Sequence, residues 1–279
     1  MRKPIVVVGS INLDLVATAD HVPLPGETII GKDFRIFHGG KGANQAVGVA
    51  RLNHPVSMLG NVGDDDFGSA LKAALRQAGV AANSVRTVRG SSGVALINIG
   101  SDGQNNIVVV PGANGQLSPK DITAHSALLR KAGMILVQLE IPLITLETVA
   151  AFAHRHKIPL MLDPAPAREL PSGLLQVVTW ITPNESETRI LCALPPSEPV
   201  TPETAARTNT DWSPSGTIFS SGGSVLCTLG RSARIPLTIS SVEAFPFLKI
   251  EISTPRRPFC RTIFDCTWNP SLTLATSRR

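Results

Sequence analysis

Two hydrogen-bonding side chains follow the first apolar run of the chain. Asn12 and Asp14 lie at alternate positions of GSINLDL, directly after the apolar residues of PIVVVGS. Side chains at alternate positions of an extended segment face the same way. A carboxylate beside an amide suits a pair of vicinal hydroxyls, as in a sugar, because the two groups together accept and donate hydrogen bonds. An Asx turn after the strand is the structural alternative for this pair.

A glycine-rich segment ahead of an expected helix is the second candidate. HGGKGANQAVGVA, residues 38–50, holds three glycines and one cation, Lys41, within its first five residues. Glycine lets a ligand approach the backbone closely, and a helix that starts near Ala43 would point its free N–H groups at that ligand. The segment matches neither the Walker pattern nor the dinucleotide-binding pattern. A tight turn with a packing glycine is the alternative.

Further polar residues close other apolar runs. Glu140 ends MILVQLE, Asp163 ends the run IPLMLD, and Asn184 and Glu187 follow TWITP. Ligands of parallel α/β sheets bind at the carboxyl ends of the strands. We therefore expect these side chains, with Asn12, to line one cleft.

The elements that would position these residues alternate between strand and helix up to about residue 207. Strand patterns at 4–10 and 56–63 are followed by helical patterns at 43–53 and 67–79. Residues 126–193 repeat the combination of helix and apolar strand three times. This alternation predicts a mostly parallel sheet with both faces covered. Residues 93–100 and 105–114 read as a β-pair with a turn between them.

Composition narrows the classes of partner. The chain has 279 residues, of which 43% are hydrophobic, so a sizeable core is possible. No apolar run approaches the ~18–20 residues of a membrane span, and MRKPIVVVGS reads as a first core strand rather than a signal peptide. Residues 1–207 hold 18 Lys and Arg against 17 Asp and Glu, so most of the +5 charge falls in residues 208–279. We expect a cytoplasmic protein with no nucleic-acid or membrane partner.

Eight motifs of the chain resemble those of the ribokinases, which belong to the PfkB family of carbohydrate kinases. They are, in order, GSINLDL, PLPGET, FHGGKGANQA, VGDDDFG, VVPGAN, LVQLEIP, DPAPARELP and ITPNESE, and the resemblance covers about residues 4–206. It implies a Rossmann-like α/β fold, with helices around the central sheet and a small β-sheet lid from segments 13–38 and 93–112. Residues 1–207 would form this domain. Residues 208–279 would stand in place of its ATP-binding end and are expected to be incomplete or disordered.

The same resemblance implies the reaction and the residues of the site. The reaction would be transfer of the γ-phosphoryl group of ATP to a pentose, D-ribose giving ribose 5-phosphate, with Mg²⁺ and a monovalent cation such as K⁺. The implied sugar-binding residues are Asn12, Asp14, Gly40, Lys41, Gly42, Asn44 and Glu140. The implied nucleotide-binding residues are Asn184, Thr228 and Gly230, and the implied magnesium ligand is Glu187. A homodimer formed through the lid is implied as well.

The last quarter of the chain departs from the family pattern. The signature D-T-T-[GA]-A-G-D, whose final Asp is the family's catalytic base, is absent, so no catalytic residue is matched. The ATP-loop pattern T-L-G-x-x-G survives only as residues 228–230. Two other interpretations therefore stay open beside a ribose kinase. One is another sugar or nucleoside kinase of the family, and the other is a catalytically inactive sugar-binding protein.

A shifted reading frame would account for the missing signature. AFPFLKIEI resembles the family's approach to it, but STPRRP follows at 253–258. The codons GTC GAC ACC ACG GCG GCC encode V-D-T-T-A-A, and read one base later they give S-T-P-R-R-P. We hypothesise frame slips near 208–224 and near 253. A genuinely diverged tail is the alternative, and the nucleotide sequence of the gene distinguishes the two.

Overall fold

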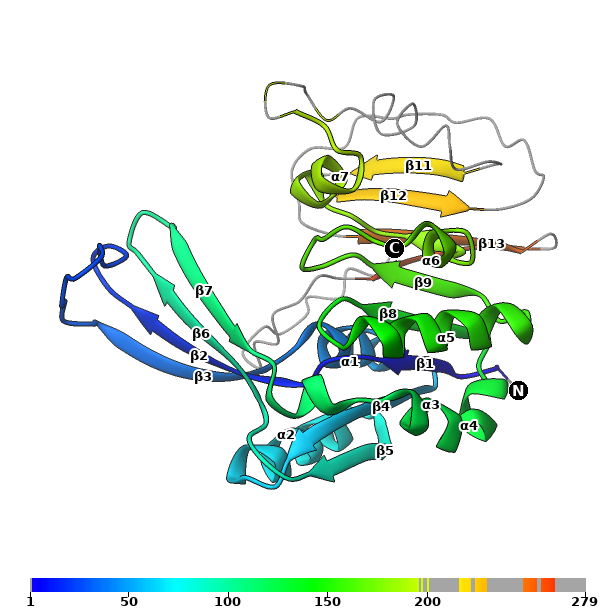
Figure 1. Ribbon diagram of the computed structural model, residues 1–279, viewed down its shortest axis with the longest axis horizontal. Helices are drawn as coiled ribbons and strands as arrows, with labels where there is room; N and C mark the ends of the chain where they lie inside the picture. Colours follow the sequence, from blue (N-terminus) through cyan, green and yellow to red (C-terminus); the bar gives the residue numbers. More distant parts are fainter. Residues whose placement is uncertain are drawn as a thin grey trace, which may run out of the picture.

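A computed structural model describes residues 2–195, 197, 200, 216–221, 224–229, 248–254 and 257–263. Its central sheet has the strand order β11-β12-β10-β9-β8-β1-β4-β5 (Figure 1). The six parallel strands are β1 (Ile5–Val8), β4 (Val56–Gly63), β5 (Ala81–Val88), β8 (Met134–Gln138), β9 (Leu160–Asp163) and β10 (Trp180–Ile181). Beyond β10 the hairpin of β11 (Gly216–Ser221) and β12 (Ser224–Leu229) adds antiparallel strands. The expected α/β class with a mostly parallel sheet is confirmed.

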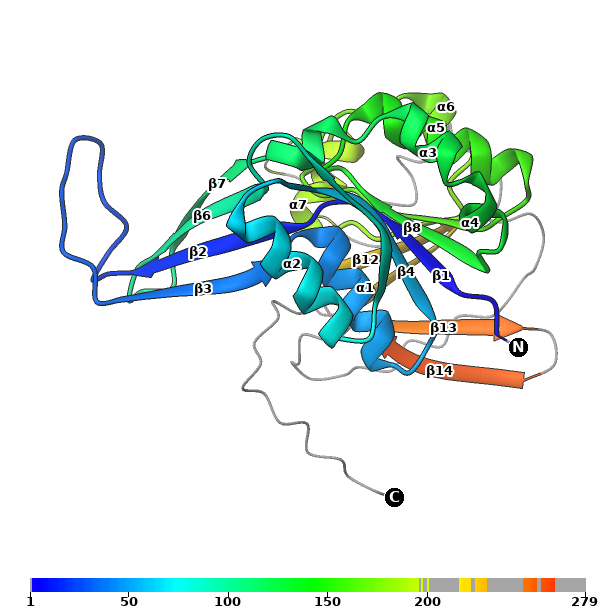
Figure 2. The same ribbon diagram turned by 90° about the horizontal axis from the view of Figure 1, so that it is seen from below.

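Helices cover both faces of this sheet (Figure 2). One face carries α1 (Lys41–Arg51) and α2 (Asp66–Gln77), and the opposite face carries α3 (Pro119–Ala124), α4 (Ser126–Arg130), α5 (Leu143–Arg155) and α6 (Ser172–Leu175). After β10 the chain enters α7 (Glu185–Leu191). The layers explain why the strand sequences read as continuous apolar runs, since neither face meets water.

Successive residues of β1 enter two separate cores. Val6 and Val8 pack in the cluster that includes Leu146 of α5, whereas Val7 packs in the cluster that includes Ala46 of α1. All three valines are fully buried. Each buried aliphatic side chain of this size stabilises the fold by about 1.5–3 kcal/mol, so β1 is anchored from both sides.

A second, smaller sheet projects from one end of the central sheet (Figure 1). We call it the small sheet. Its strands, in the order β3-β2-β6-β7, are β3 (Asp33–Gly39), β2 (Asn12–Thr18), β6 (Gly93–Ile99) and β7 (Asn105–Val110). Strands β6 and β7 pair antiparallel, as the sequence predicts, and Gly103 supplies a positive φ in the turn between them.

Short connections join the small sheet to the core. Three residues separate β1 from β2, and only Gly40 separates β3 from α1. After β7 a 3₁₀ turn, η1 (Gly112–Gln116), leads the chain back into the core. The junction of the two sheets therefore gathers residues from several distant parts of the sequence.

The remaining described strands form a separate hairpin, β13 (Leu248–Thr254) with β14 (Arg257–Ile263). The proposed division of the chain at residue 207 lies outside the described residues and stays a prediction. In the described part of the chain no helix has the length and apolar character that crossing a membrane requires.

Candidate active site

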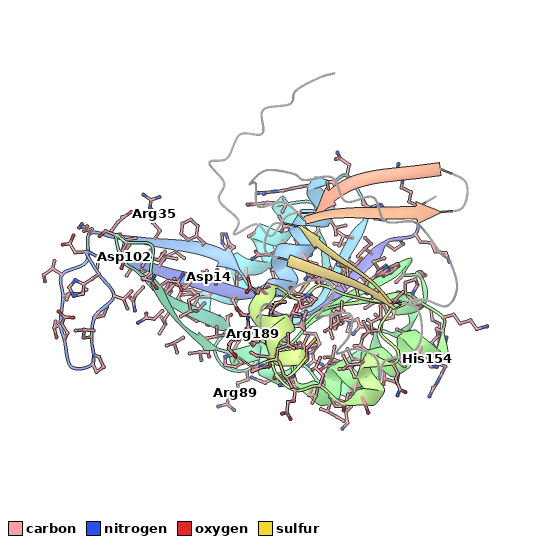
Figure 3. The ribbon with its side chains drawn as sticks, turned by 90° about the horizontal axis from the view of Figure 1, so that it is seen from above. Asp14, Arg35, Arg89, Asp102, His154 and Arg189 are labelled. Atoms are coloured by element: carbon pink, nitrogen blue, oxygen red, sulfur yellow. The ribbon has the colours of Figure 1, made fainter. Side chains whose placement is uncertain are left out.

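The candidate sugar residues meet at the junction of the two sheets. Asp14 lies at the base of the small sheet, whereas Arg35 and Asp102 lie toward its far end (Figure 3). Asn12 begins β2 at the same junction and pairs in register with Gly39 of β3 and Gly93 of β6. Asn12 is 3% exposed, and its Oδ1 accepts a hydrogen bond from Asn114 Nδ2 at 2.7 Å.

The environment of Asp14 disfavours its charge. Burial, and secondarily the negative charge of Glu140, raise the pKa of Asp14 from 3.8 to about 6. The carboxylate lies over Gly39, where a Cβ would overlap it. A glycine at this position of β3 is therefore what admits the carboxylate.

Glu140 is held through one of its two carboxylate oxygens. Oε2 accepts hydrogen bonds from Ser10 Oγ and, at 3.2 Å, from the backbone N–H of Lys41. The backbone N–H of Gly42 donates to Ser10 Oγ at 3.3 Å. Among the described residues Oε1 of Glu140 has no hydrogen-bond partner, so one oxygen remains to accept a hydrogen bond from a ligand hydroxyl.

These contacts cap the N-terminus of α1 from outside the helix. Its N-cap is Gly40, which offers no side chain, and its first turn contains no acidic residue. The helix begins at Lys41, two residues before the predicted start at Ala43, because Glu140 and Ser10 satisfy the first N–H groups.

The glycine loop lies directly against the β1–β2 connection. Gly40 has φ +90°, and a Cβ there would lie 2.7 Å from Asn12 N and 2.9 Å from Ser10 O. A Cβ on Gly42 would lie 2.7 Å from Ser10 N. The loop therefore needs glycine for close backbone packing at both positions.

Lys41 and Asn44 occupy the first turn of α1. Lys41 is partly buried, and the Asn44 N–H donates to the carbonyl of Gly40 at 2.9 Å. Asn44 also borders a small apolar recess together with His38 and Leu71. The structure thus brings Asn12, Asp14, Gly40, Lys41, Gly42, Asn44 and Glu140 to one junction.

A glutamine network next to Glu140 was not identified from the sequence. Gln138 Nε2 donates to Gln45 Oε1 at 2.6 Å, and Gln45 Nε2 donates to Asp163 Oδ2 at 3.0 Å. Gln138 is completely buried. The network ties α1 to the carboxyl ends of β8 and β9. The sequence signal for this network was a polar side chain, Gln138, at the end of the apolar run MILVQ.

The candidate nucleotide residues are farther along the central sheet. Asn184 caps α7 in a closed capping box, in which Glu187 N–H donates to Asn184 Oδ1 at 2.8 Å and Asn184 N–H donates to Glu187 Oε2 at 2.7 Å. The backbone of Thr228 in β12 pairs with Trp180 of β10. Gly230 and the rest of the predicted ATP loop lie outside the described residues, so they stay predictions.

The carboxylate of Glu187 has the chemistry of a single magnesium ligand. Its two oxygens accept one hydrogen bond each from Asn184, and each carboxylate oxygen has a second lone-pair direction. Mg²⁺ is commonly held by one or two carboxylates together with water and phosphate oxygens, which matches a single available side chain. Groups of three or more His, Cys, Asp or Glu suited to a metal do not occur in the described part of the chain.

Comparison of the sequence with known proteins gives one consistent family. The family model described as pfkB family carbohydrate kinase matches residues 2–210. Ribokinase of Bacillus subtilis is 44% identical over 190 residues, which cover 68% of this chain and 64% of that protein. Ribokinase of Haemophilus influenzae is 39% identical, and deoxyribokinase of Salmonella typhi is 40% identical; each match covers 68% of this chain and 63% of the relative. The chain thus spans less than two thirds of the length of these relatives.

Solved structures agree with the sequence comparison. A ribokinase of Arabidopsis thaliana complexed with ribose and ATP superposes with a TM-score of 0.71 at 32% identity, over 83% of this chain and 77% of that one. Ribokinase of Thermotoga maritima gives a TM-score of 0.72 at 30% identity, over 88% and 82%. The chain belongs to the pfkB family of carbohydrate kinases.

Proposed function

We propose that the junction site binds a pentose, D-ribose, as the acceptor for the γ-phosphoryl group of ATP. One observation carries the proposal. Asn12 and Asp14 share one face of β2, and Glu140 lies close enough to raise the pKa of Asp14 and keeps Oε1 without a partner among the described residues. An amide and two carboxylates in one place suit a polyhydroxylated ligand. The ribokinases and the deoxyribokinase among the relatives support a pentose.

The chain's own residues would contribute positioning and charge. Asp14 and Glu140 accept hydrogen bonds from sugar hydroxyls, and the partly buried Lys41 adds a cation at the start of α1. Asn184 and Glu187 would serve the nucleotide side, where ATP supplies the phosphoryl group and Mg²⁺ neutralises charge. Phosphoryl transfer depends mainly on such positioning and neutralisation, and the small sheet would exclude water from the reacting groups.

We expect phosphoryl transfer by this sequence to be weak or absent. The family signature that ends in the catalytic base does not occur in it. Loss of a general base costs ~10²–10⁴-fold in rate. Sugar binding without transfer is therefore the second candidate function, and the missing signature is the observation that favours it.

Calorimetry and an assay of ADP release test the proposal together. The full chain is titrated with D-ribose, 2-deoxyribose, fructose and adenosine, and ADP release is measured with ATP, Mg²⁺ and K⁺. We expect D-ribose to bind with the highest affinity and little ADP to form. A second chain, expressed from the gene with the frame restored at codons 208–224 and 253, should bind ribose equally and release ADP. Preference for fructose or adenosine, or no binding at all, would refute a ribose site.

We further propose that the small sheet pairs with a second copy of the chain. Ile36, Leu15, Leu96 and Val108 form one row across the sheet, on the face opposite to Asp14. Ile36, Leu96 and Val108 are 53%, 44% and 58% exposed. Leu15 between them is partly buried. An apolar row with three exposed members is typical of a protein contact surface.

Sedimentation velocity measures this association. Leu96→Glu should shift a dimer toward monomer, because it places a charge in the centre of the apolar row. Ile144→Glu is the matched control, since Ile144 is also an exposed apolar residue but lies on α5. A monomer at all concentrations, or equal effects of the two substitutions, would contradict pairing through the small sheet.

A further inference from the structure

Asn114 borders the proposed sugar site and is the last residue of the VVPGAN motif, but it is not among the site residues that the resemblance implies. It lies on η1, the turn that follows the last strand of the small sheet, and is 2% exposed. Its Oδ1 accepts from Ile11 N at 2.9 Å, and its Nδ2 donates to Ile11 O at 3.2 Å. The same Nδ2 donates to Asn12 Oδ1 at 2.7 Å. Asn114 thus joins the backbone of the β1–β2 connection to the side chain of Asn12.

Backbone groups fix the orientation of both amides. A backbone N–H only donates and a backbone carbonyl only accepts, so Ile11 holds the amide of Asn114 in a single orientation. That orientation turns Asn114 Nδ2, which only donates, toward Asn12. Asn12 therefore accepts this hydrogen bond with its Oδ1, and its Nδ2 points away from Asn114. No hydrogen bond engages Asn12 Nδ2 within the part of the chain that the structure describes.

The backbone around the two amides is shaped to admit them. Gly93 stands opposite Asn12 in the register of β6 with β2. A Cβ at Gly93 would overlap both Asn12 Oδ1 and Asn114 Nδ2. Only glycine leaves room there, which independently indicates that the amide pair is a built feature of the junction.

We propose that Asn114 is a positioning residue that holds the Asn12 amide with Nδ2 toward the ligand. Resting on the proposed sugar-binding function, this assigns opposite roles to two neighbouring hydroxyls. The hydroxyl at Asn12 must accept a hydrogen bond, and the hydroxyl at the Asp14 carboxylate must donate one. The site then favours sugars with adjacent hydroxyls in that arrangement and penalises loss of the hydroxyl that faces Asn12.

Monodeoxy sugars measure this arrangement in the full chain. Affinities for D-ribose and for its 2-, 3- and 5-deoxy analogues are determined by calorimetry for the unaltered protein and for Asn114→Leu, which removes the amide and keeps the approximate side-chain size. We expect ribose affinity to fall about tenfold or more in the variant. The penalty for one deoxy sugar should shrink to about twofold or less, while the other penalties stay. Unchanged penalties for all three sugars would overturn the proposal.

Asn12→Asp provides a second route to the same result. It leaves the bonds between Asn114 and Ile11 intact and still offers an oxygen to Asn114, but it replaces the outward donor with an acceptor. The hydroxyl at this position would then donate to the new carboxylate instead of accepting, so the penalty for the same deoxy sugar should change while the other two penalties stay. Thr145→Val is the structural control, because Thr145 is fully buried and its Oγ1 donates to Leu117 O at 2.6 Å near the end of η1. It should leave all penalties unchanged.

A spectroscopic readout tests the inference without any sugar. The side-chain NH₂ signals of Asn12 are assigned in the ¹⁵N–¹H spectrum by their absence in Asn12→Asp. They should shift in Asn114→Leu and keep their positions in Thr145→Val. If they stay in place in Asn114→Leu, Asn114 does not orient Asn12. If the unaltered chain binds no sugar, the proposed function fails, and these signals still decide the role of Asn114.

Discussion

Helices α1 and α7 both begin among candidate site residues, but their N-termini are satisfied in opposite ways. The box of Asn184 and Glu187 closes the first turn of α7 from within four consecutive residues. The first turn of α1 has no side-chain cap of its own, and Glu140 and Ser10 supply the acceptors from distant strand ends. The start of α7 is thus encoded locally, whereas the start of α1 exists only when β1 and β8 are already in place.

Because the two helix starts are capped differently, substitutions at them should affect stability and sugar binding differently. At α1 the same carboxylate caps the helix and belongs to the proposed sugar site, so a change there should affect folding and binding together. At α7 the cap is self-contained, so a change should weaken that helix and leave the sugar site intact. Substitutions at the two helix starts, each with a matched control, test whether the two differ in this way.

Gly40→Ala should have the largest effect on stability. The residue has φ +90°, and the new Cβ would lie 2.7 Å from Asn12 N and 2.9 Å from Ser10 O, both backbone atoms that cannot rotate away. Backbone strain together with overpacking predicts a loss of about 3 kcal/mol in the free energy of unfolding, measured by denaturant titration.

Gly79→Ala is the control for backbone strain alone. Gly79 has φ +85°, and the nearest atom to a new Cβ is Ala50 Cβ at 3.9 Å. We expect a loss of about 1 kcal/mol from the unfavourable φ. Equal losses at the two glycines would mean that the loop before α1 is not packed against the β1–β2 connection as described.

Glu140→Gln should come next, with effects on both stability and binding. Replacing a carboxylate that caps α1 weakens charge-assisted hydrogen bonds worth about 1.5–3 kcal/mol, so we expect a loss of about 2 kcal/mol on unfolding. Ribose affinity should fall in parallel, as measured by calorimetry. Glu187→Gln, the equivalent change at α7, should leave ribose affinity unchanged. A loss of ribose affinity in both variants would remove the distinction between the two helix starts.

The sequence predicted what depends on local pattern and on motif spacing. The alternation of apolar runs predicted the parallel sheet, because strands buried on both faces read as continuous apolar segments. The pair β6–β7 was predicted because its two apolar segments are joined by a short turn. The motifs placed Asn12, Asp14 and Glu140 among the sugar residues. The structure brings them together at the junction of the two sheets, as the strand-end rule requires.

Hydrogen bonds between residues that are distant in the sequence could not be predicted. The helix was predicted to start near Ala43, whereas α1 starts at Lys41, whose N–H donates to the distant residue Glu140. Gln45 and Asn114 were missed for the same reason, since their polar partners lie on strands far away in sequence. The capping box at Asn184 was also not predicted, because N-x-x-E was interpreted only as a nucleotide and magnesium motif, although the same pattern is a local capping-box signal.

Asn184→Ala should have a smaller and more local effect. It removes the N-cap of α7 and should cost about 1 kcal/mol in the free energy of unfolding. Ser118→Ala removes the corresponding residue of the capping box at α3 and should cost a similar amount, so the pair calibrates cap loss. Ribose affinity should be unchanged in both, and nucleotide binding should weaken only in Asn184→Ala. A ribose defect in Asn184→Ala would show that the two helix starts are coupled.

Asp14→Asn should have the smallest effect and the opposite sign. Burial and the charge of Glu140 raise the pKa of Asp14 from 3.8 to about 6, so the folded state binds its proton more tightly than the unfolded chain does. The stabilising contribution of the protonated form is complete below about pH 4 and is lost as the pH rises through about 6. Asparagine avoids this loss, so the variant should gain stability between about pH 4 and 6 and keep the gain at neutral pH. Solvent screening of the partly exposed side chain limits the gain to about 1 kcal/mol or less.

Asp20→Asn is the control near the small sheet, because the pKa of Asp20 is lowered where that of Asp14 is raised. A hydrogen bond from Lys32 and its charge lower the pKa of Asp20, so any contribution of this pair is present at neutral pH and lost on acidification. Melting temperatures followed against pH should therefore rise for Asp14→Asn and stay level or fall for Asp20→Asn at neutral pH, while ribose binding is lost only in Asp14→Asn. The proposed sugar site would then cost the fold stability at neutral pH, because the carboxylate that accepts a hydrogen bond from the sugar lies where burial disfavours its charge. An Asp14→Asn protein less stable than the unaltered chain at neutral pH would show that the carboxylate of Asp14 stabilises the junction instead.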